Sequence, residues 1–292
     1  MNSTSKILKS VMLLAVLCVQ AAIADDALKP YIMTTATYES IPAATAAVTV
    51  KLSQAGFQVA GQYTPFEGAL VMGITSDTLR STAAKSEHGG FGAAIRVSIT
   101  QAGDTLQIAY VNPAYMAAIY RMESLAEVSS ALATAFGEGQ PFGSEKGRTA
   151  AKLAKYHYMM AMPYFDDLDV LAHYDSHADA VANIEKNLAA GVADTVKVYR
   201  VDVTGKEETL FGVGLRSGDG SDQTVMANAD LADTKHTAHL PYELLVSGSD
   251  VIALRGRFRI AQSFPDLTMG TFMKIRSAPG AIKNTLKQVA QP

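Results

Sequence analysis

Apolar and polar residues alternate most clearly around the dipeptide Gly103-Asp104. Every second position on both sides of it is apolar: Ile95, Val97 and Ile99 before it, and Leu106, Ile108 and Tyr110 after it. A period of two puts one face of a strand in the core and leaves the other face wetter. The segment 95–110 is therefore predicted to be a β-hairpin.

Helical periods flank this hairpin. Apolar residues recur at helical spacing from Pro42 to Ala55, with Ser40 as a suitable N-cap and Gly56 as the stop. Pro113 begins a second helical pattern that runs to about residue 136. Three strand-like segments complete the first half: 34–39, 57–63 and 69–75. The predicted order is β-α-β-β-β-β-α.

The second half matches the first at two separate places. Residues 36–40 (ATYES) align with 172–176 (AHYDS), and 116–124 aligns without a gap with 269–277. Strands are expected at 196–203, 209–215, 242–246 and 251–260. The chain is therefore predicted to be an α+β protein of two β-α-β4-α repeats that form an internal pseudo-dimer, with antiparallel sheets and helices on one face.

The division that follows has four parts. These are a signal peptide (1–24), a first repeat (25–137), a linker with a short helix and an apolar segment at 156–165 (138–167), and a second repeat (168–292). In the helix after each proline, one set of residues is expected to face the sheet: Met116, Ile119, Tyr120 and Val128 in the first, and Met269, Phe272, Met273 and Ile282 in the second.

Two proline junctions connect this order to a known family. They are Asn112-Pro113-Ala114-Tyr115 and Phe264-Pro265-Asp266-Leu267. A β-α-β4-α order with such junctions resembles the domain of unknown function 302 family, whose fold is similar to the TATA-box-binding-protein-like α+β class. The resemblance covers roughly 34–137 and 168–290. A cysteine often precedes the Asn-Pro in that family, whereas this chain has Val111. The resemblance implies a fold and no activity, and DNA binding does not follow from it.

The first 24 residues have the pattern of a secretory signal peptide. Lys6 and Lys9 precede a short apolar run, and Ala22-Ile23-Ala24 is a small-x-small cleavage site. Cleavage after Ala24 predicts a periplasmic or secreted protein with no integral membrane segment after signal removal. The only cysteine, Cys18, would leave with the signal, so disulfides, zinc–thiolate sites and cysteine catalysis are excluded.

Charge narrows the choice of partner. The whole chain has a formal net charge of −3, and the only charged residues of the signal peptide, Lys6 and Lys9, are basic. A mildly acidic protein is a poor candidate for nucleic-acid binding, which needs concentrated positive charge. We expect a small molecule or a protein as the partner and no nucleic acid.

Histidine and methionine residues supply two candidate metal sites. Four of the six histidines lie in the second half, at His173, His177, His236 and His239. Neutral imidazole could bind zinc or copper there, although loop and cap histidines explain the same residues. His157 with Met159, Met160 and Met162 could hold copper(I). The same segment also fits a buried strand, because Tyr158, Met160, Met162 and Tyr164 would lie on one side of it. No cofactor is expected.

Three arginines carry the sharpest functional hypothesis. On a strand over 251–260, Arg255, Arg257 and Arg259 would share one face, opposite four apolar residues. They would either pair internally with Glu243, Asp202, Glu207 or Glu208, or form a face that recognises a carboxylate or phosphate. We therefore expect a non-catalytic binding or scaffold module, with a metal-binding protein or an enzyme of undetermined class as the alternatives.

Overall fold

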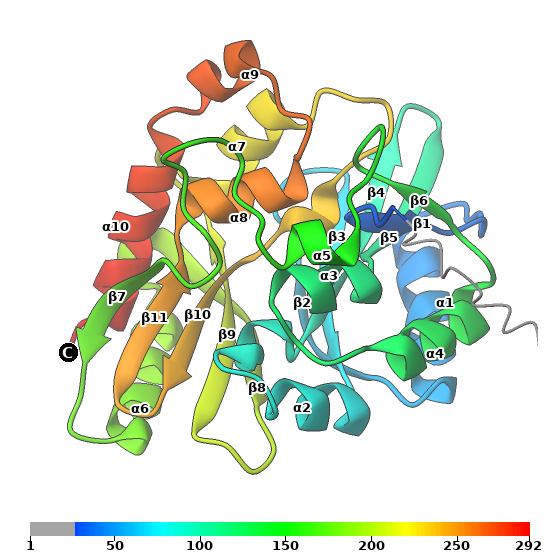
Figure 1. The fold of residues 1–292 in the computed structure, drawn as a ribbon. Coiled ribbons are helices and arrows are strands. Elements are labelled where there is room, and N and C mark those ends of the chain that lie inside the picture. Colours follow the sequence, from blue (N-terminus) through cyan, green and yellow to red (C-terminus); the bar gives the residue numbers. More distant parts are fainter. Residues whose placement is uncertain (1–26) are drawn as a thin grey trace, which may run out of the picture.

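The computed structural model describes residues 27–292, so the predicted signal peptide lies outside the described residues. The fold is α+β, with two antiparallel sheets lying side by side and helices packed around them (Figure 1). Within the described residues, no helix is both long and apolar enough to cross a membrane.

The first sheet has the strand order β2-β3-β4-β5-β1-β6. Its strands are β1 (Tyr31–Met33), β2 (Gln58–Tyr63), β3 (Ala69–Thr75), β4 (Ile95–Ala102), β5 (Thr105–Val111) and β6 (Gln140–Phe142). The second sheet has the order β7-β11-β10-β9-β8. Its strands are β7 (Leu168–His173), β8 (Thr195–Asp202), β9 (Glu208–Leu215), β10 (Tyr242–Ser247) and β11 (Asp250–Leu254). Counted from the start of each half, the first five strands of both sheets follow the same order.

The helices fall between these strands. In the first half they are α1 (Ile41–Gln54), α2 (Asp77–Ala83), η1 (Gly89–Gly92), α3 (Pro113–Ile119), α4 (Ala126–Phe136) and α5 (Ala150–Leu153). In the second half they are α6 (His177–Ala189), η2 (Val192–Asp194), α7 (Asp222–Ala229), η3 (Thr237–His239), α8 (Gly256–Ser263), α9 (Met269–Lys274) and α10 (Ala278–Ala290).

Local sequence patterns account for the first half well. The hairpin of β4 and β5 is confirmed, with Ile99 opposite Ile108. Helix α1 is confirmed too, and the Ser40 hydroxyl accepts a hydrogen bond from the Ala43 amide as an N-cap. The prediction of a strand at 34–39 is wrong. The residues that pair with β5 are those of β1, which ends just before this segment.

The long helix predicted from Pro113 is two helices. It breaks after Ile119, and Arg121 has a left-handed φ of 53°. The Arg121 guanidinium holds this turn by donating to both carboxylate oxygens of Asp166, at 2.8 and 2.9 Å. The break turns α4 back onto the core, where Val128 is buried as predicted.

The strand predicted at 251–260 is also wrong beyond its first residues. Strand β11 ends at Leu254, where its pairing with β7 ends, and α8 begins at Gly256. A Cβ at Gly256 would lie 2.8 Å from the Cα of Pro279, so only glycine fits where this helix starts against α10. Arg255, Arg257 and Arg259 therefore do not share one face of a strand.

The two prolines occupy different places in the topology. Pro113 opens α3 directly after β5, whereas Pro265 lies between α8 and α9, a whole helix after β11. The predicted equivalence of the two junctions is therefore wrong. The buried face assigned to the second helix is wrong as well at Met269 and Met273, which are 53% and 49% exposed, while Ile282 is buried.

The predicted linker is partly absorbed into the fold. Its strand β6 pairs with β1 and extends the first sheet. The segment 156–165 forms no strand; its ends, Tyr156 and Phe165, are buried against Phe258, while Met160 is 90% exposed.

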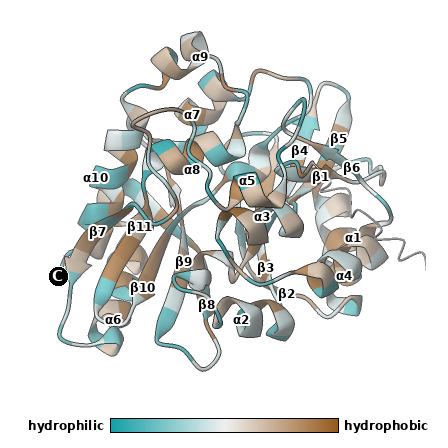
Figure 2. Cartoon of the chain, viewed as in Figure 1, coloured by the Kyte–Doolittle hydropathy of each residue, from teal (hydrophilic) through white to brown (hydrophobic). Residues whose placement is uncertain are grey.

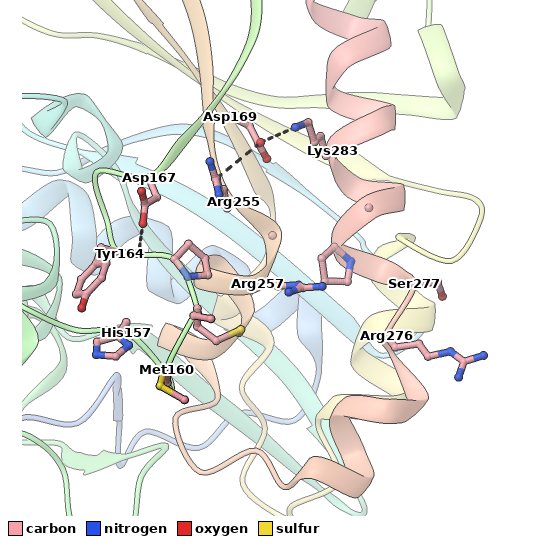
Figure 3. A pocket seen from close by; sticks show the side chains of 16 residues that line it. His157, Met160, Tyr164, Asp167, Asp169, Arg255, Arg257, Arg276, Ser277 and Lys283 are labelled. Carbon is pink, nitrogen blue, oxygen red and sulfur yellow. Dashed lines mark hydrogen bonds and ion pairs between the residues drawn. The ribbon is translucent and has the colours of Figure 1, made fainter.

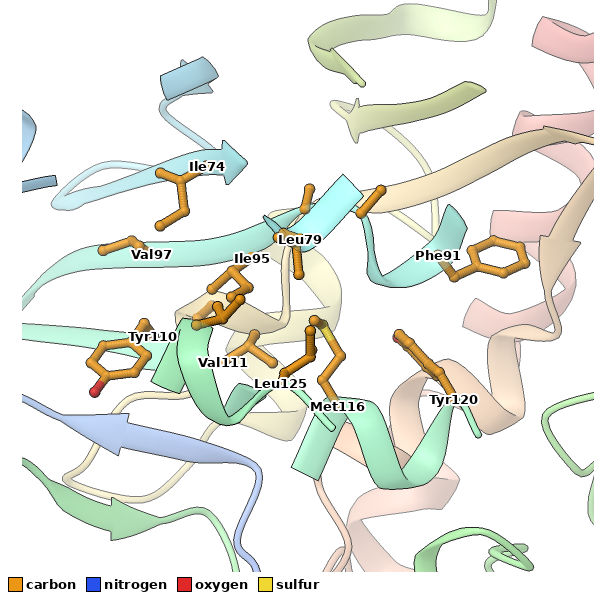
Figure 4. Packing of buried hydrophobic residues seen from close by; sticks show 14 of the residues in the cluster. Ile74, Leu79, Phe91, Ile95, Val97, Tyr110, Val111, Met116, Tyr120 and Leu125 are labelled. Carbon is orange, nitrogen blue, oxygen red and sulfur yellow. The ribbon is translucent and has the colours of Figure 1, made fainter. Parts of the chain in front are cut away.

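Each sheet has an outer face covered by its own helices and an inner face turned toward the other half. Helices α1 and α4 contribute Val48, Leu52 and Val128 to the core of the first sheet, part of which Figure 4 shows. Helices α6 and α10 cover the second sheet, whose strands β10 and β11 are coloured largely hydrophobic in Figure 2. Residues on the inner face of the second sheet, such as Leu210 and Leu245, belong to the same buried cluster as the first-half core.

The halves also exchange short helical segments. Segment η1 of the first half lies against β9 and β10, and η3 of the second half lies against β4 and β5. A hydrogen bond accompanies each contact. The Gly90 amide donates to Glu208 at 2.9 Å, and Arg96 Nε donates to the Ala238 carbonyl at 3.1 Å. The edge strands β2 and β8 meet as well, where Gly61 lies too close to the Val198 carbonyl for any side chain.

Candidate functional site

A groove of about 940 Å³ lies beside the start of α8 (Figure 3). Three segments form it: the connection 157–169 that leads into β7, the first residues of α8 and the first residues of α10. We call it the basic groove, and define it by these lining residues: His157, Met160, Met162, Tyr164, Asp167, Asp169, Arg255, Arg257, Arg276 and Lys283.

Cations outnumber carboxylates in the basic groove. Asp169 is shared by Lys283, at 2.6 Å, and by Arg255, whose Nε is 4.0 Å away. Arg257 and Arg276 are exposed and form no ion pair with any residue of the described range 27–292. Four cationic and two acidic side chains leave a surplus of two positive charges around one opening.

Two helices begin at this opening. Arg255 is the N-cap of α8 and Ser277 is the N-cap of α10, and neither side chain forms a capping hydrogen bond. The first amides of a helix lack intrahelical acceptors and carry partial positive charge. Because Gly256 packs on Pro279, the two helix starts lie together, and both add to the positive potential of the arginines.

The opposite wall is apolar. Met160 and Met162 line it with Tyr164, whose ring centroid lies 4.6 Å from that of His157. His157 Nδ1 is 2.8 Å from the Met159 carbonyl, which holds this turn together. The basic groove therefore offers an apolar wall facing a cationic one.

Arg259 lies outside the groove and is a core residue. It is 2% exposed, and its Nη1 contacts His239 Nδ1 at 3.0 Å and donates to Ser263 at 2.9 Å. Its Nε is 3.7 Å from a carboxylate oxygen of Glu243, so internal pairing is confirmed for this arginine. Burial, and then the neighbouring Arg259, lower the pKa of His239 well below its usual value, which keeps the ring neutral so that Nδ1 accepts.

The histidines proposed as metal ligands each have their own partners. His173 contacts Asp250 at 2.7 Å, His177 contacts Thr209 at 3.3 Å, and His236 contacts Asp230 at 2.7 Å. Across residues 27–292 there is no group of three or more His, Cys, Asp or Glu side chains that could hold a metal ion. Of the proposed copper(I) ligands, His157, Met160 and Met162 line the basic groove, and copper binding there stays a prediction.

The junction residues are structural. Asn112 caps α3 by accepting from the Ala114 amide, and its side-chain amide donates to the Lys29 carbonyl. Pro113 follows as the first residue of α3. Phe264 is buried between the rings of His236 and His239.

Sequence reasoning missed Arg276 and Lys283. The run Arg276-Ser277-Ala278-Pro279 does predict a helix start, since Ser is a favoured N-cap and Pro is favoured in the first turn. That signal places a cation at a helix N-terminus. It does not show that this N-terminus meets the start of α8.

Comparison of the chain with family models, with curated proteins and with solved structures finds no match in any of the three.

Proposed function

We propose that this protein is an exported, non-catalytic binding module that takes up an anionic small molecule in the basic groove. The observation that carries the proposal is the pair Arg257 and Arg276, which lie exposed and unpaired within the described chain where two helices begin. Arginine forks bind carboxylate and phosphate bidentately, and helix N-termini attract the same groups. Export rests on the signal-peptide pattern of residues 1–24 alone.

The apolar wall narrows the ligand class. Met160 is almost fully exposed, and Met159 and Tyr164 near it are 44% and 39% exposed, so these side chains leave a small apolar surface open to a ligand. A ligand that carries a phosphate or carboxylate on a short apolar body would use both walls.

Binding is favoured over catalysis by the contacts of the titratable groups. His157 bonds a backbone carbonyl, and Asp167 accepts from the Tyr164 amide at 2.9 Å. Asp169 accepts a hydrogen bond from Lys283 Nζ at 2.6 Å. None of these contacts joins a nucleophile to a base, as covalent or acid–base catalysis would need.

We also propose that the two halves are tandem β-α-β4-α units arranged as an internal pseudo-dimer, as the resemblance to the domain of unknown function 302 family implies. The common strand order and the reciprocal placement of η1 and η3 support this proposal. In this arrangement α8 corresponds to α3, and Arg255 takes the place of Asn112. The second unit would then have lost a neutral helix cap and gained a cation at the groove.

Calorimetric titration with butyl phosphate tests the binding proposal. We expect saturable binding that weakens with rising salt, because exposed charges are screened. The double variant Arg257→Gln/Arg276→Gln should bind at least about tenfold more weakly, about 1.4 kcal/mol. Inorganic phosphate should bind more weakly than butyl phosphate, because it cannot use the apolar wall.

Arg216 provides a matched control. It is exposed, lies outside the groove and has no side-chain hydrogen bond within the described chain. Arg216→Gln changes the net charge by one unit and should leave the affinity for butyl phosphate nearly unchanged. Equal affinity in wild type and in the double variant would exclude the groove as an anion site.

A further inference from the structure

A second cavity, of about 400 Å³, lies away from the basic groove, and we call it the aromatic cavity. It is formed by the end of β6, the loop that follows α7 and the connection from α8 to α9. Its apolar lining comprises Phe142, Leu231, Phe264 and Leu267, together with the ring of His236.

Aromatic rings pack around His236 in this lining. The His236 ring centroid lies 5.5 Å from that of Phe142 and 5.0 Å from that of Phe264. Leu231 is 57% exposed at the cavity, a large apolar side chain left in water. Such a wall favours a flat apolar molecule, because rings pack on rings in offset or edge-to-face geometry.

One polar atom in this wall has a fixed chemical role. His236 Nδ1 lies 2.7 Å from Asp230 Oδ1, and Asp230 Oδ2 accepts from the His236 backbone amide at 2.8 Å. Because a carboxylate only accepts, Nδ1 of the neutral ring carries the proton, which leaves Nε2 as an acceptor. Nε2 has no hydrogen-bond partner within the described range.

The charges around the aromatic cavity are mixed. Lys29, Glu145 and Asp266 line it, and Asp266 accepts from the Glu145 amide at 2.6 Å. The cavity thus lacks the surplus of positive charge that marks the basic groove, and a neutral ligand suits it better than an anion.

We propose that the aromatic cavity binds a neutral, planar aromatic molecule with one O–H or N–H donor, of the phenol or indole class. The ring would pack on the Phe142, Phe264 and Leu231 wall, and the donor would bond to His236 Nε2. The proposal is independent of the function proposed for the basic groove.

Fluorescence titration with 2-naphthol tests it on the full chain, which contains no tryptophan to interfere with the probe signal. We expect saturable binding of 2-naphthol, and about fivefold weaker binding of 2-methoxynaphthalene, which has the same ring system and no donor. Loss of saturable 2-naphthol binding, or equal affinity for the two probes, would overturn the proposal.

Two variants locate the site. His236→Asn keeps a donor for Asp230 but removes the Nε2 acceptor, so it should bind the two probes with equal affinity. Leu231→Ser changes an exposed residue, so the variant should keep its fold. It should bind both probes severalfold more weakly than the wild type does. Arg216→Gln, at an exposed residue that lines neither cavity, should leave both affinities unchanged. If Leu231→Ser has no effect, the probe binds elsewhere and the proposal fails, whether or not His236→Asn folds.

Discussion

At the residue scale, the buried polar groups that matter most join the two halves. Arg96 donates to Glu243 at 3.1 Å across the centre, and the Tyr199 hydroxyl donates to the same carboxylate at 2.7 Å. At a second point, the Tyr63 hydroxyl donates to Asp222 at 2.9 Å. A buried charge without such partners would cost several kcal/mol, so these contacts fix how the halves meet.

Asp222 makes stability depend on pH. Burial raises the pKa of its carboxyl to about 7, although hydrogen bonds from Tyr63 and from the Leu215 amide act in the opposite direction. The folded state therefore holds the proton more tightly than the unfolded state. Stability contributed by this group is present below the unfolded pKa and is lost as pH rises toward 7, at about 1.4 kcal/mol per pKa unit.

Asp222→Asn should remove this dependence. The amide oxygen can still accept from Tyr63 and Leu215, and the amide replaces an oxygen, Oδ1, that has no partner in the described chain. Relative to wild type, the variant should gain thermal stability as pH rises from 5 to 8 and should show little gain near pH 4. Thermal melts across that range provide the measurement. Parallel curves for the two proteins would show that Asp222 ionises normally.

At the element scale, prediction from sequence worked where one local pattern decided the structure. The hairpin of β4 and β5 needed only alternation, and α1 needed only a cap, a period and a stop. It failed at 251–260, because apolar residues there fit a strand at first and a helix later. The helix that follows the strand begins at Gly256, where it packs on Pro279, a residue 23 positions further along the chain.

The candidate site could likewise be predicted only where local sequence decided it. Arg255 and Arg257 were identified as candidates from composition and spacing, although on the wrong element. Arg259 was separated from them only by its buried contacts with His239 and Ser263. Arg276 and Lys283 could not be assigned to the site, because their place depends on α10 packing beside α8.

Helices α9 and α10 should differ in their response to truncation. Ile282 of α10 is 2% exposed in the buried cluster that also holds Val213 and Leu286, so Ile282→Ala should cost about 2–5 kcal/mol. Met269 of α9 is half exposed, so Met269→Ala should change the free energy of unfolding by no more than about 0.5 kcal/mol. Denaturant melts of both variants provide the comparison. A large loss in Met269→Ala would mean that α9 packs against a surface in solution.

At the scale of the whole molecule, the halves share one core. Val198, Tyr199 and Leu245 of the second half lie in the same buried cluster as Ile74 and Val97 of the first. Segments of each half therefore cover the inner face of the other half's sheet, as η1 does on β9 and β10 and η3 does on β4 and β5.

Unfolding should consequently be a single transition. We expect calorimetry to give one peak, with the calorimetric and van't Hoff enthalpies equal. Glu243→Gln leaves the buried Arg96 without its counter-charge. It should lower the melting temperature of that one peak and reduce the free energy of unfolding by about 3–5 kcal/mol. Two peaks, of which only the second-half peak moves, would show that the halves fold separately.

The exchange of η1 and η3 sets an order for biosynthesis. The inner face of the first sheet, which includes Val71, Gly73 and Arg96, is complete in sequence by residue 111. The residues that cover it belong to the second half, with Tyr199 beside Gly73 and Thr237–His239 against β4 and β5. More than a hundred residues must therefore leave the ribosome while that face has no cover from its own chain. A nascent chain of this protein should need a holding chaperone over that interval, and its first half should be most vulnerable to aggregation before residue 237 is made.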